Sequence, residues 1–390
     1  MRKTVFKLRT IILATITLTW ALISGAAELV EVKTITFKSN VADRKNLQER
    51  IKLPYVVTSR QSVTDNINHH LYLENFDSLA PAHPEEPIDS ADIVPEGIIE
   101  QSFVSYGIKN RVFGITLNFE ACGAYCEVAE KSYNYDLSSG RFISLKSLFF
   151  QGNLAALSRR YSVVQMERYK SLINDFSNQL LEQRKRPLDK EGAEIIDDLQ
   201  ARIEFNRNCL EGIESLEQKD DYEIEQRNSM RFQIKESELV VSMERCSVHA
   251  TLALDDAGEI SMSVPYEEFR GKLSQYGYNL IFGEQVTGLE EYSNFSGQIL
   301  HGTIGRFPII MKIAVEKGKI YGVYFYEKYR RPIKIEGRQQ GNEIILLESG
   351  DIKMDLIRDG DFFEGWWRGK KSFPMKVYFP KEQSNGLWNK

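Results

Sequence analysis

The stretch RVFGITLNFEACGAYCEVAEKSYNYDL, residues 111–137, decides the first half of the fold. Together with residues 99–108 it contains three runs rich in β-branched and aromatic side chains. Asn110 separates the first two runs, and the turn residues 138–140 follow the third. Short strands bounded by such turn residues are typical of an antiparallel meander. The sequence therefore predicts three consecutive antiparallel strands here.

Downstream of this meander, the hydrophobic period changes from two residues to between three and five. Apolar residues follow the longer spacing from Asn153 to Leu180, and Pro187 comes soon after. This pattern predicts a long amphipathic helix that ends before the proline. A second helix is expected from Asp189 to Asn206, so that the two form a helical hairpin that covers the sheet.

Upstream of the meander, the pattern predicts a small layer of strands and one helix. Residues 28–38 and 53–57 read as strands, and residues 62–74 have helical spacing. The proline-rich residues 77–97 are expected to form a loop. With the helical hairpin, these elements predict an α+β domain that contains an antiparallel sheet.

The rest of the first domain is expected to add more strands. Residues 211–228 are acidic and weakly periodic, which favours a solvated connection. Strands are predicted within residues 231–244 and 251–264, the latter divided by a turn at residues 255–258. Pro265 then favours the start of a helix.

The hydrophobic pattern loosens between Tyr276 and Phe295, which we interpret as a domain boundary. From Gly297 onward, eight short strands follow one another with turn residues about every ten positions. Such a meander exposes two edges unless it closes on itself, so the pattern predicts a small up-and-down β-barrel. The expected domains are residues 28–283 and 297–381.

Four cysteines permit three disulfide pairings. The pairing that we favour is Cys122 with Cys126 and Cys209 with Cys246, because the chain already holds the first pair close. On chain entropy alone, the short loop would stabilise the fold by roughly 2 kcal/mol and the long loop by roughly 4 kcal/mol. We expect both bonds to be structural. No metal site or cofactor is predicted.

The first 27 residues have the three parts of a secretory signal peptide. A head with four Lys and Arg residues precedes a mostly apolar run and a small-residue exit, which predicts cleavage near Ala26 or Ala27. Retention as a membrane anchor is the alternative, although the run is short for a span. After cleavage, no stable membrane span is expected. The predicted location is periplasmic or secreted, in a bacterium.

Charge and motifs exclude several classes of function. Without the leader, the formal net charge falls from -5 to -9, and the positive residues are scattered, so nucleic acid is not an expected partner. The sequence has no HExxH, no G-x-S-x-G and no glycine-rich phosphate loop, and its histidines are dispersed. No catalytic residue is therefore predicted.

The run from Ile115 to Phe149, which contains YNYDL and FISLKSLF, resembles the bacterial extracytoplasmic domain-of-unknown-function family 3298. Residues 246–273 resemble the second half of the same domain. Relatives of this domain occur on an anti-sigma factor that senses lysozyme by binding it, and on a peptidoglycan deacetylase. The C-terminal strands resemble an uncharacterised small β-barrel module of envelope proteins.

The resemblance implies contact with a lysozyme-like protein or with the cell wall. Family members often carry histidine in the loop that here reads Cys122-Gly-Ala-Tyr-Cys126, so this chain departs from the family at that point. Tyr125 in this loop is a candidate binding residue.

The aromatic residues of the C-terminal strands are the other candidate binding site, because aromatic faces beside arginines suit sugars or a protein anchor. Filling of the barrel core is the alternative role for the inward members. In the pair Trp366-Trp367, strand alternation places the two rings on opposite faces. The candidate binding residues here are Tyr324, Tyr326, Arg330, Trp366 and Trp367.

These features together favour an exported, non-enzymatic envelope protein. We expect it to bind a cell-wall component, such as peptidoglycan fragments, or a wall-active protein such as lysozyme. The alternative from a different class is a peptidoglycan-modifying enzyme or its accessory subunit.

Overall fold

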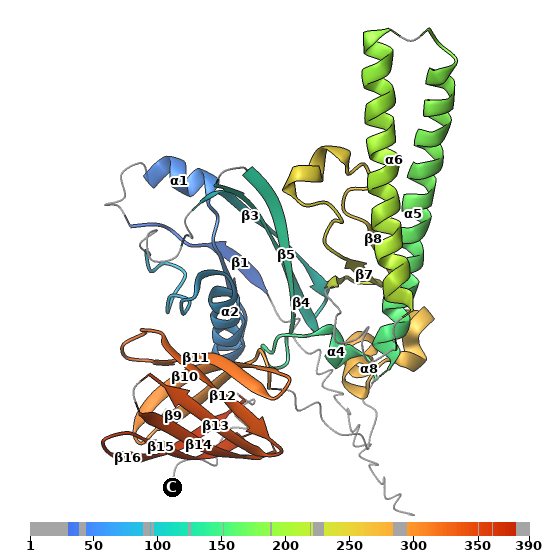
Figure 1. Ribbon diagram of the computed structural model, residues 1–390. Coiled ribbons are helices and arrows are strands. Elements are labelled where there is room, and N and C mark those ends of the chain that lie inside the picture. The colour runs from blue at the N-terminus through green and yellow to red at the C-terminus, as the bar shows by residue number, and fades with distance from the viewer. Residues whose placement is uncertain are drawn as a thin grey trace, which may run out of the picture.

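The computed structural model describes residues 30–38, 44–88, 94, 97–123, 126–150, 152–187, 189–218, 220, 230–283, 295–349, 351–360 and 362–379. An α+β part comes first, and a closed antiparallel barrel of eight strands follows it (Figure 1). This architecture confirms the predicted fold class. The predicted signal peptide at residues 1–27 lies outside the described residues.

The expected meander is present as the long antiparallel sheet of the first part. Strands β3 (Ile98–Ile108), β4 (Val112–Cys122) and β5 (Cys126–Asp136) pair in that order, with β4 in the middle. The β4–β5 register runs without a bulge from one end to the other. The three runs of the quoted stretch therefore form one sheet.

One face of this sheet is covered by the small layer that precedes it in the chain. This layer contains β1 (Glu31–Thr34), α1 (Arg44–Arg50), β2 (Pro54–Val57) and α2 (Gln61–Phe76). The buried Asn68 of α2 holds β2 in place, since its amide bonds both the N–H and the carbonyl of Val56 at 2.8 and 2.7 Å. Helix α2 was expected, whereas α1 was not.

A second sheet and several short helices surround another hydrophobic core. Its strands are β6 (Arg231–Ile234), β7 (Glu238–Ser242) and β8 (Ser261–Pro265), and the short helices are α4 (Leu145–Leu148), η2 (Tyr266–Lys272) and α8 (Gln275–Phe282). Helix η2 begins directly after Pro265, as predicted. Helix α8 falls within the stretch that we interpreted as a boundary, so its first part is helical instead of irregular.

The predicted strand at residues 251–254 is wrong. These residues belong to the 3-10 helix η1 (His249–Leu254). The hydroxyl of Thr251 accepts from the Val248 N–H and donates to the Val248 carbonyl, at 3.2 and 3.1 Å. Such local side-chain bonds compete with a strand ladder, and four residues carry too little alternation to overcome them.

The helical hairpin projects from the body as a long arm (Figure 1). It consists of α5 (Asn153–Arg184) and α6 (Lys190–Glu217), whose mutual packing confirms the hairpin. Only the first turns of α5, with Leu154, Leu157 and Tyr161, join the core beside β6–β8, so the hairpin covers a sheet at its base alone and does not lie over the β3–β5 sheet. Helix α6 continues beyond its expected end at Asn206 and includes the first part of the predicted connection. Cys209 and Ile213 cause this extension, because both pack on Tyr169 of α5.

The barrel consists of consecutive antiparallel hairpins, and its last strand pairs with its first. Its inward side chains are apolar and fully packed along the middle of the barrel. The strands are β9 (Ile299–Ile304), β10 (Phe307–Glu316), β11 (Lys319–Tyr326), β12 (Ile333–Gln340), β13 (Glu343–Glu348), β14 (Ile352–Asp359), β15 (Phe362–Arg368) and β16 (Ser372–Tyr378).

Helix α2 packs against the outside of the barrel (Figure 1). Leu73 of α2 and the adjacent Leu79 form a buried apolar cluster with three outward residues of the barrel, Ile299, Ile310 and Phe325. Polar contacts frame this joint: Glu74 is paired with Lys312, and His301 Nε2 lies 3.0 Å from Asn66 Oδ1. The barrel is thus fixed to the α+β part by an apolar contact with polar surroundings.

Candidate functional site

The two ends of the barrel differ in how they are filled. At one end the ring of Phe295 packs on Phe363, with 4.9 Å between the centroids, and the guanidinium of Arg358 covers Phe295 at 5.2 Å. The other end is bordered by the turns that follow β9, β11, β13 and β15. We call this second end the open end, because a pocket enters it.

One wall of the open end is formed by tyrosines at the end of β11 and by an acid at the end of β13. The hydroxyl of Tyr324 donates to Oε2 of Glu348 at 2.6 Å, and the ring of Tyr326 lies 5.6 Å from that of Tyr324. Burial raises the pKa of Tyr324, and the hydrogen bond to Glu348 raises it further. Burial also raises the pKa of Tyr326. Both phenols therefore stay protonated at neutral pH.

The other wall carries the pocket, which has a volume of about 710 Å³. Trp367 and Phe373 form its aromatic side, with their ring centroids 5.9 Å apart, and Ile352 lies beside them. Lys370 and Lys371 stand at its rim, in the turn between β15 and β16. A mostly apolar pocket of this size with a few polar groups is typical of a small-molecule site.

Trp367 also has an unusual hydrogen-bonding state. Its indole Nε1 is buried and has no hydrogen-bond partner among the described residues. Buried polar groups are usually satisfied, so this donor is an exception in the wall of the pocket, and its burial keeps it out of reach of a molecule in the pocket. The pocket therefore offers the aromatic faces of Trp367 and Phe373, the carboxylate of Asp351 and the ammonium groups of two lysines.

Three of the predicted binding residues, Tyr324, Tyr326 and Trp367, lie at this end of the barrel. Of these only Trp367 lines the pocket, while Tyr324 is buried and fills the barrel core. Trp366 points outward and is 47% exposed, so the two tryptophans lie on opposite faces, as the alternation predicted. Trp366 is paired in register with Asp355, whose carboxylate binds Lys353 and Arg368. Trp366 thus lies on the charged outer face of the barrel, on the opposite side of β15 from the pocket.

The other two predicted residues do not join this group. Arg330 donates to the carbonyl of Ala80, so it connects the barrel to the loop after α2. Tyr125 lies outside the described residues. Sequence reasoning missed Glu348, Phe373 and the lysine pair 370–371. The alternation of β13 and β16 could have revealed Glu348 and Phe373, because both share the inward phase of their buried neighbours.

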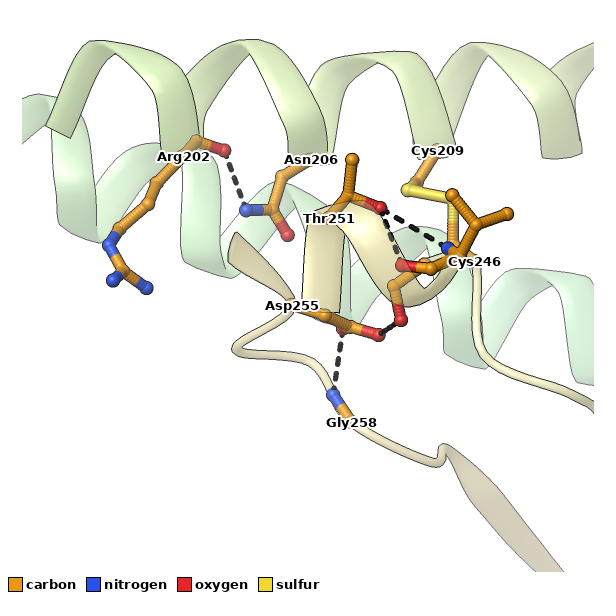
Figure 2. The surroundings of a disulfide bond; sticks show 9 residues. Arg202, Asn206, Cys209, Cys246, Thr251, Asp255 and Gly258 are labelled. Carbon is orange, nitrogen blue, oxygen red and sulfur yellow. Dashed lines mark hydrogen bonds between the residues drawn. A yellow bond between two sulfur atoms is a disulfide. The ribbon is translucent and has the colours of Figure 1, made fainter. Parts of the chain in front are cut away.

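The cysteines are paired as predicted. The Cys122–Cys126 bond closes the tip of the β4–β5 hairpin, and Cys209–Cys246 joins α6 to the segment before η1 (Figure 2). Figure 2 also shows the buried Asn206, whose amide donates to the carbonyl of Arg202. Glu120 lies close to the first disulfide, but these sulfurs are bonded to each other and offer no thiolate. This group therefore does not fit a metal ion.

Within the part of the chain that the structure describes, no helix is long and apolar enough to cross a membrane. The comparisons add no family: no protein-family model matches the chain, and no curated protein matches it in sequence. The resemblance to the extracytoplasmic domain stays a prediction.

Proposed function

We propose that this is an exported, non-enzymatic envelope protein that binds a cell-wall component at the open end of its barrel. The observation that supports this function best is the pocket beside Trp367 and Phe373. Aromatic rings provide large apolar faces for a sugar ring, and Asp351 and the rim lysines provide partners for hydroxyl and carboxylate groups. Peptidoglycan fragments combine these chemical groups.

The two disulfides support a periplasmic or secreted location, since such bonds persist mainly in oxidising compartments. Export through the predicted leader belongs to the same proposal. Amino-terminal sequencing of the protein from its own cells tests this step, and cleavage after Ala26 or Ala27 is the expected result. An intact amino terminus would favour the anchor alternative instead.

Calorimetric titration of the oxidised protein with soluble peptidoglycan fragments tests the ligand. Trp367→Leu should weaken binding at least tenfold, because it removes the aromatic wall of the pocket, whereas Trp366→Leu on the outer face should leave binding unchanged. Thermal unfolding of both variants confirms that each still folds. Equal losses for the two variants would contradict a site at the open end.

A lysozyme-like protein is the other partner that the sequence resemblance implies, and it serves as the second titrant. Binding of lysozyme with no heat from the fragments would replace the wall ligand by a protein ligand. Release of soluble fragments from intact peptidoglycan would instead favour the enzyme alternative.

A further inference from the structure

The backbone of β5 directs alternate residues away from β4. In an antiparallel ladder, residues whose N–H and C=O groups do not face the partner strand face the opposite side. The Asp136 N–H bonds Arg141 and the Asn134 carbonyl accepts from Ile143, both on the side away from β4. Because the β4–β5 register has no bulge, the even-numbered residues of β5 all direct their backbone groups outward.

Much of this outer edge is occupied by the protein itself. Besides the bonds to residues 141 and 143, the side chain of Asn134 bonds the backbone of Phe232 and Ile234 in β6. Further along, Nη1 of Arg231 donates to the Glu130 carbonyl at 2.9 Å. These contacts thus occupy the edge at Asp136, at Asn134 and at the carbonyl of Glu130.

Beyond Glu130, no described strand pairs with the edge, and we call this part the open edge. Among the described residues, the backbone N–H and C=O of Val128 have no hydrogen-bond partner, and its side chain is 77% exposed. All residues from Cys126 to Lys131 are exposed. Natural proteins usually blunt such an edge with a bulge, a proline or charged side chains. This segment has neither a bulge nor a proline, and its charged side chains oppose a strand of like charge but not one of opposite charge.

Two further features suit this segment for binding. The Cys122–Cys126 disulfide closes the hairpin at its tip, which limits fraying and lowers the entropic cost of adding a strand. The side chains around the open edge are mainly acidic, with Glu120, Glu127 and Glu130 against Lys131 and Arg231, and Arg231 is itself paired with Glu259. A partner segment with Lys or Arg would complement this charge.

We propose that the open edge of β5, from Cys126 to Glu130, is a docking site for an extended, basic segment of a partner polypeptide. This segment adds to the sheet as a strand beside β5. Backbone hydrogen bonds to Val128 provide the affinity, and the glutamates select basic side chains. The site is separate from the open end of the barrel and does not depend on the wall ligand.

Val128→Pro is the sharpest variant, because proline removes only an N–H that points outward and leaves the β4 ladder complete. Val128→Thr is the matched control, since it keeps the N–H and changes the side chain. The probe is an acetylated peptide of alternating lysine and valine. Its counterpart with methylated alternate amides keeps the charge but lacks the outward donors.

Titrations are followed by fluorescence anisotropy of the labelled peptides against the full-length oxidised protein. We expect the unmodified probe to bind wild type and Val128→Thr equally, and Val128→Pro at least tenfold more weakly. The methylated probe should bind wild type at least tenfold more weakly than the unmodified probe. Hydrogen exchange of the Val128 amide should slow when the unmodified probe binds.

Three results would overturn the proposal. Equal binding of both probes would mean that charge alone attracts the peptide, and equal binding by Val128→Pro would place the peptide elsewhere. No binding at millimolar peptide would mean that the edge accepts no strand of this chemistry. Analytical sedimentation tests whether a second copy of the chain occupies the edge instead. A dimer that Val128→Pro abolishes would assign the edge to that second copy.

Discussion

Trp366 and Trp367 are neighbours in the chain, yet their environments differ completely. One ring lies on a charged outer wall, and the other packs on the barrel core at the open end. Tyr321 and Tyr324 of β11 show the same contrast, because Tyr321 is exposed while Tyr324 is fully buried against Glu348. At the scale of residues, position along the strand decides whether a side chain points into the barrel or outward, and cover by α2 then buries outward residues such as Phe325.

Tyr324→Phe should lower the free energy of unfolding by about 1.5 to 3 kcal/mol, because a hydrogen bond to a charged carboxylate is lost. Tyr321→Phe removes an exposed hydroxyl and should change the free energy of unfolding by less than about 0.5 kcal/mol. Urea unfolding at neutral pH measures both variants. Similar values for the two would show that the Tyr324–Glu348 bond contributes nothing to stability.

At the scale of elements, the two disulfides act on different parts of the chain. Cys122–Cys126 closes a loop of 4 residues inside one hairpin, whereas Cys209–Cys246 closes a loop of 37 residues and ties the helical arm to the segment before η1. The longer loop restrains the unfolded chain more strongly. The arm should therefore depend on its disulfide more than the hairpin does.

Replacing Cys209 and Cys246 by alanine should lower the free energy of unfolding by about 4 kcal/mol. The same change at Cys122 and Cys126 should cost about 2 kcal/mol. Chemical unfolding of both double variants gives the comparison. A larger loss for the short loop would show that chain entropy is not the main contribution.

At the scale of the whole molecule, the joint between α2 and the barrel buries ionisable groups. Burial lowers the pKa of His69 and of His70 to about 3, and that of His301 to about 4. Burial alone would raise the pKa of Glu74, but His70 and Lys312 lower it overall. Because the pKa of each of these four groups is lower in the folded state than in the unfolded chain, each group makes the free energy of unfolding larger at higher pH.

The free energy of unfolding should be steady above pH 6.5 and fall as the pH drops below it. The unfolded histidines take up protons near pH 6.5, whereas the folded ones do so only near pH 3 to 4, so acid favours the unfolded chain. Each histidine contributes up to about 1.4 kcal/mol per pH unit. Urea titrations between pH 8 and pH 4.5 measure this slope.

His301→Gln keeps a polar partner for Asn66 and removes one titrating group, so its stability should fall less steeply with acid than that of wild type. His83→Gln is the control, because His83 lies in the loop after α2 and is not part of the buried joint. An unchanged slope in His301→Gln would show that this histidine is accessible to protons in the folded protein.

Phe325→Ala should separate the contributions of joint and barrel. Removing this fully buried ring from the contact with Leu73 and Leu79 should lower stability by about 3 to 5 kcal/mol. Because Phe325 points outward from the barrel, the barrel itself should stay closed. Near-ultraviolet circular dichroism follows the barrel aromatics, and loss of their signal before unfolding would contradict this expectation.

The sequence by itself determined the meander, the helical arm, the eight barrel strands and the opposite faces of Trp366 and Trp367. These features depend on local periodicity and turn residues, which can be read directly from the amino-acid sequence. The predicted strand at residues 251–254 failed because its hydrophobic pattern was short, so local hydrogen bonds formed η1 instead. The predicted second helix ended too early because its last turns are held by packing on Tyr169 of α5, a distant residue. Only the tertiary structure decided which barrel end is open and which residues meet there, such as Glu348 and Tyr324. It also turned Arg330 toward Ala80 and buried the histidines of α2. Each of these results depends on contacts between residues far apart in the chain, which local sequence patterns do not contain.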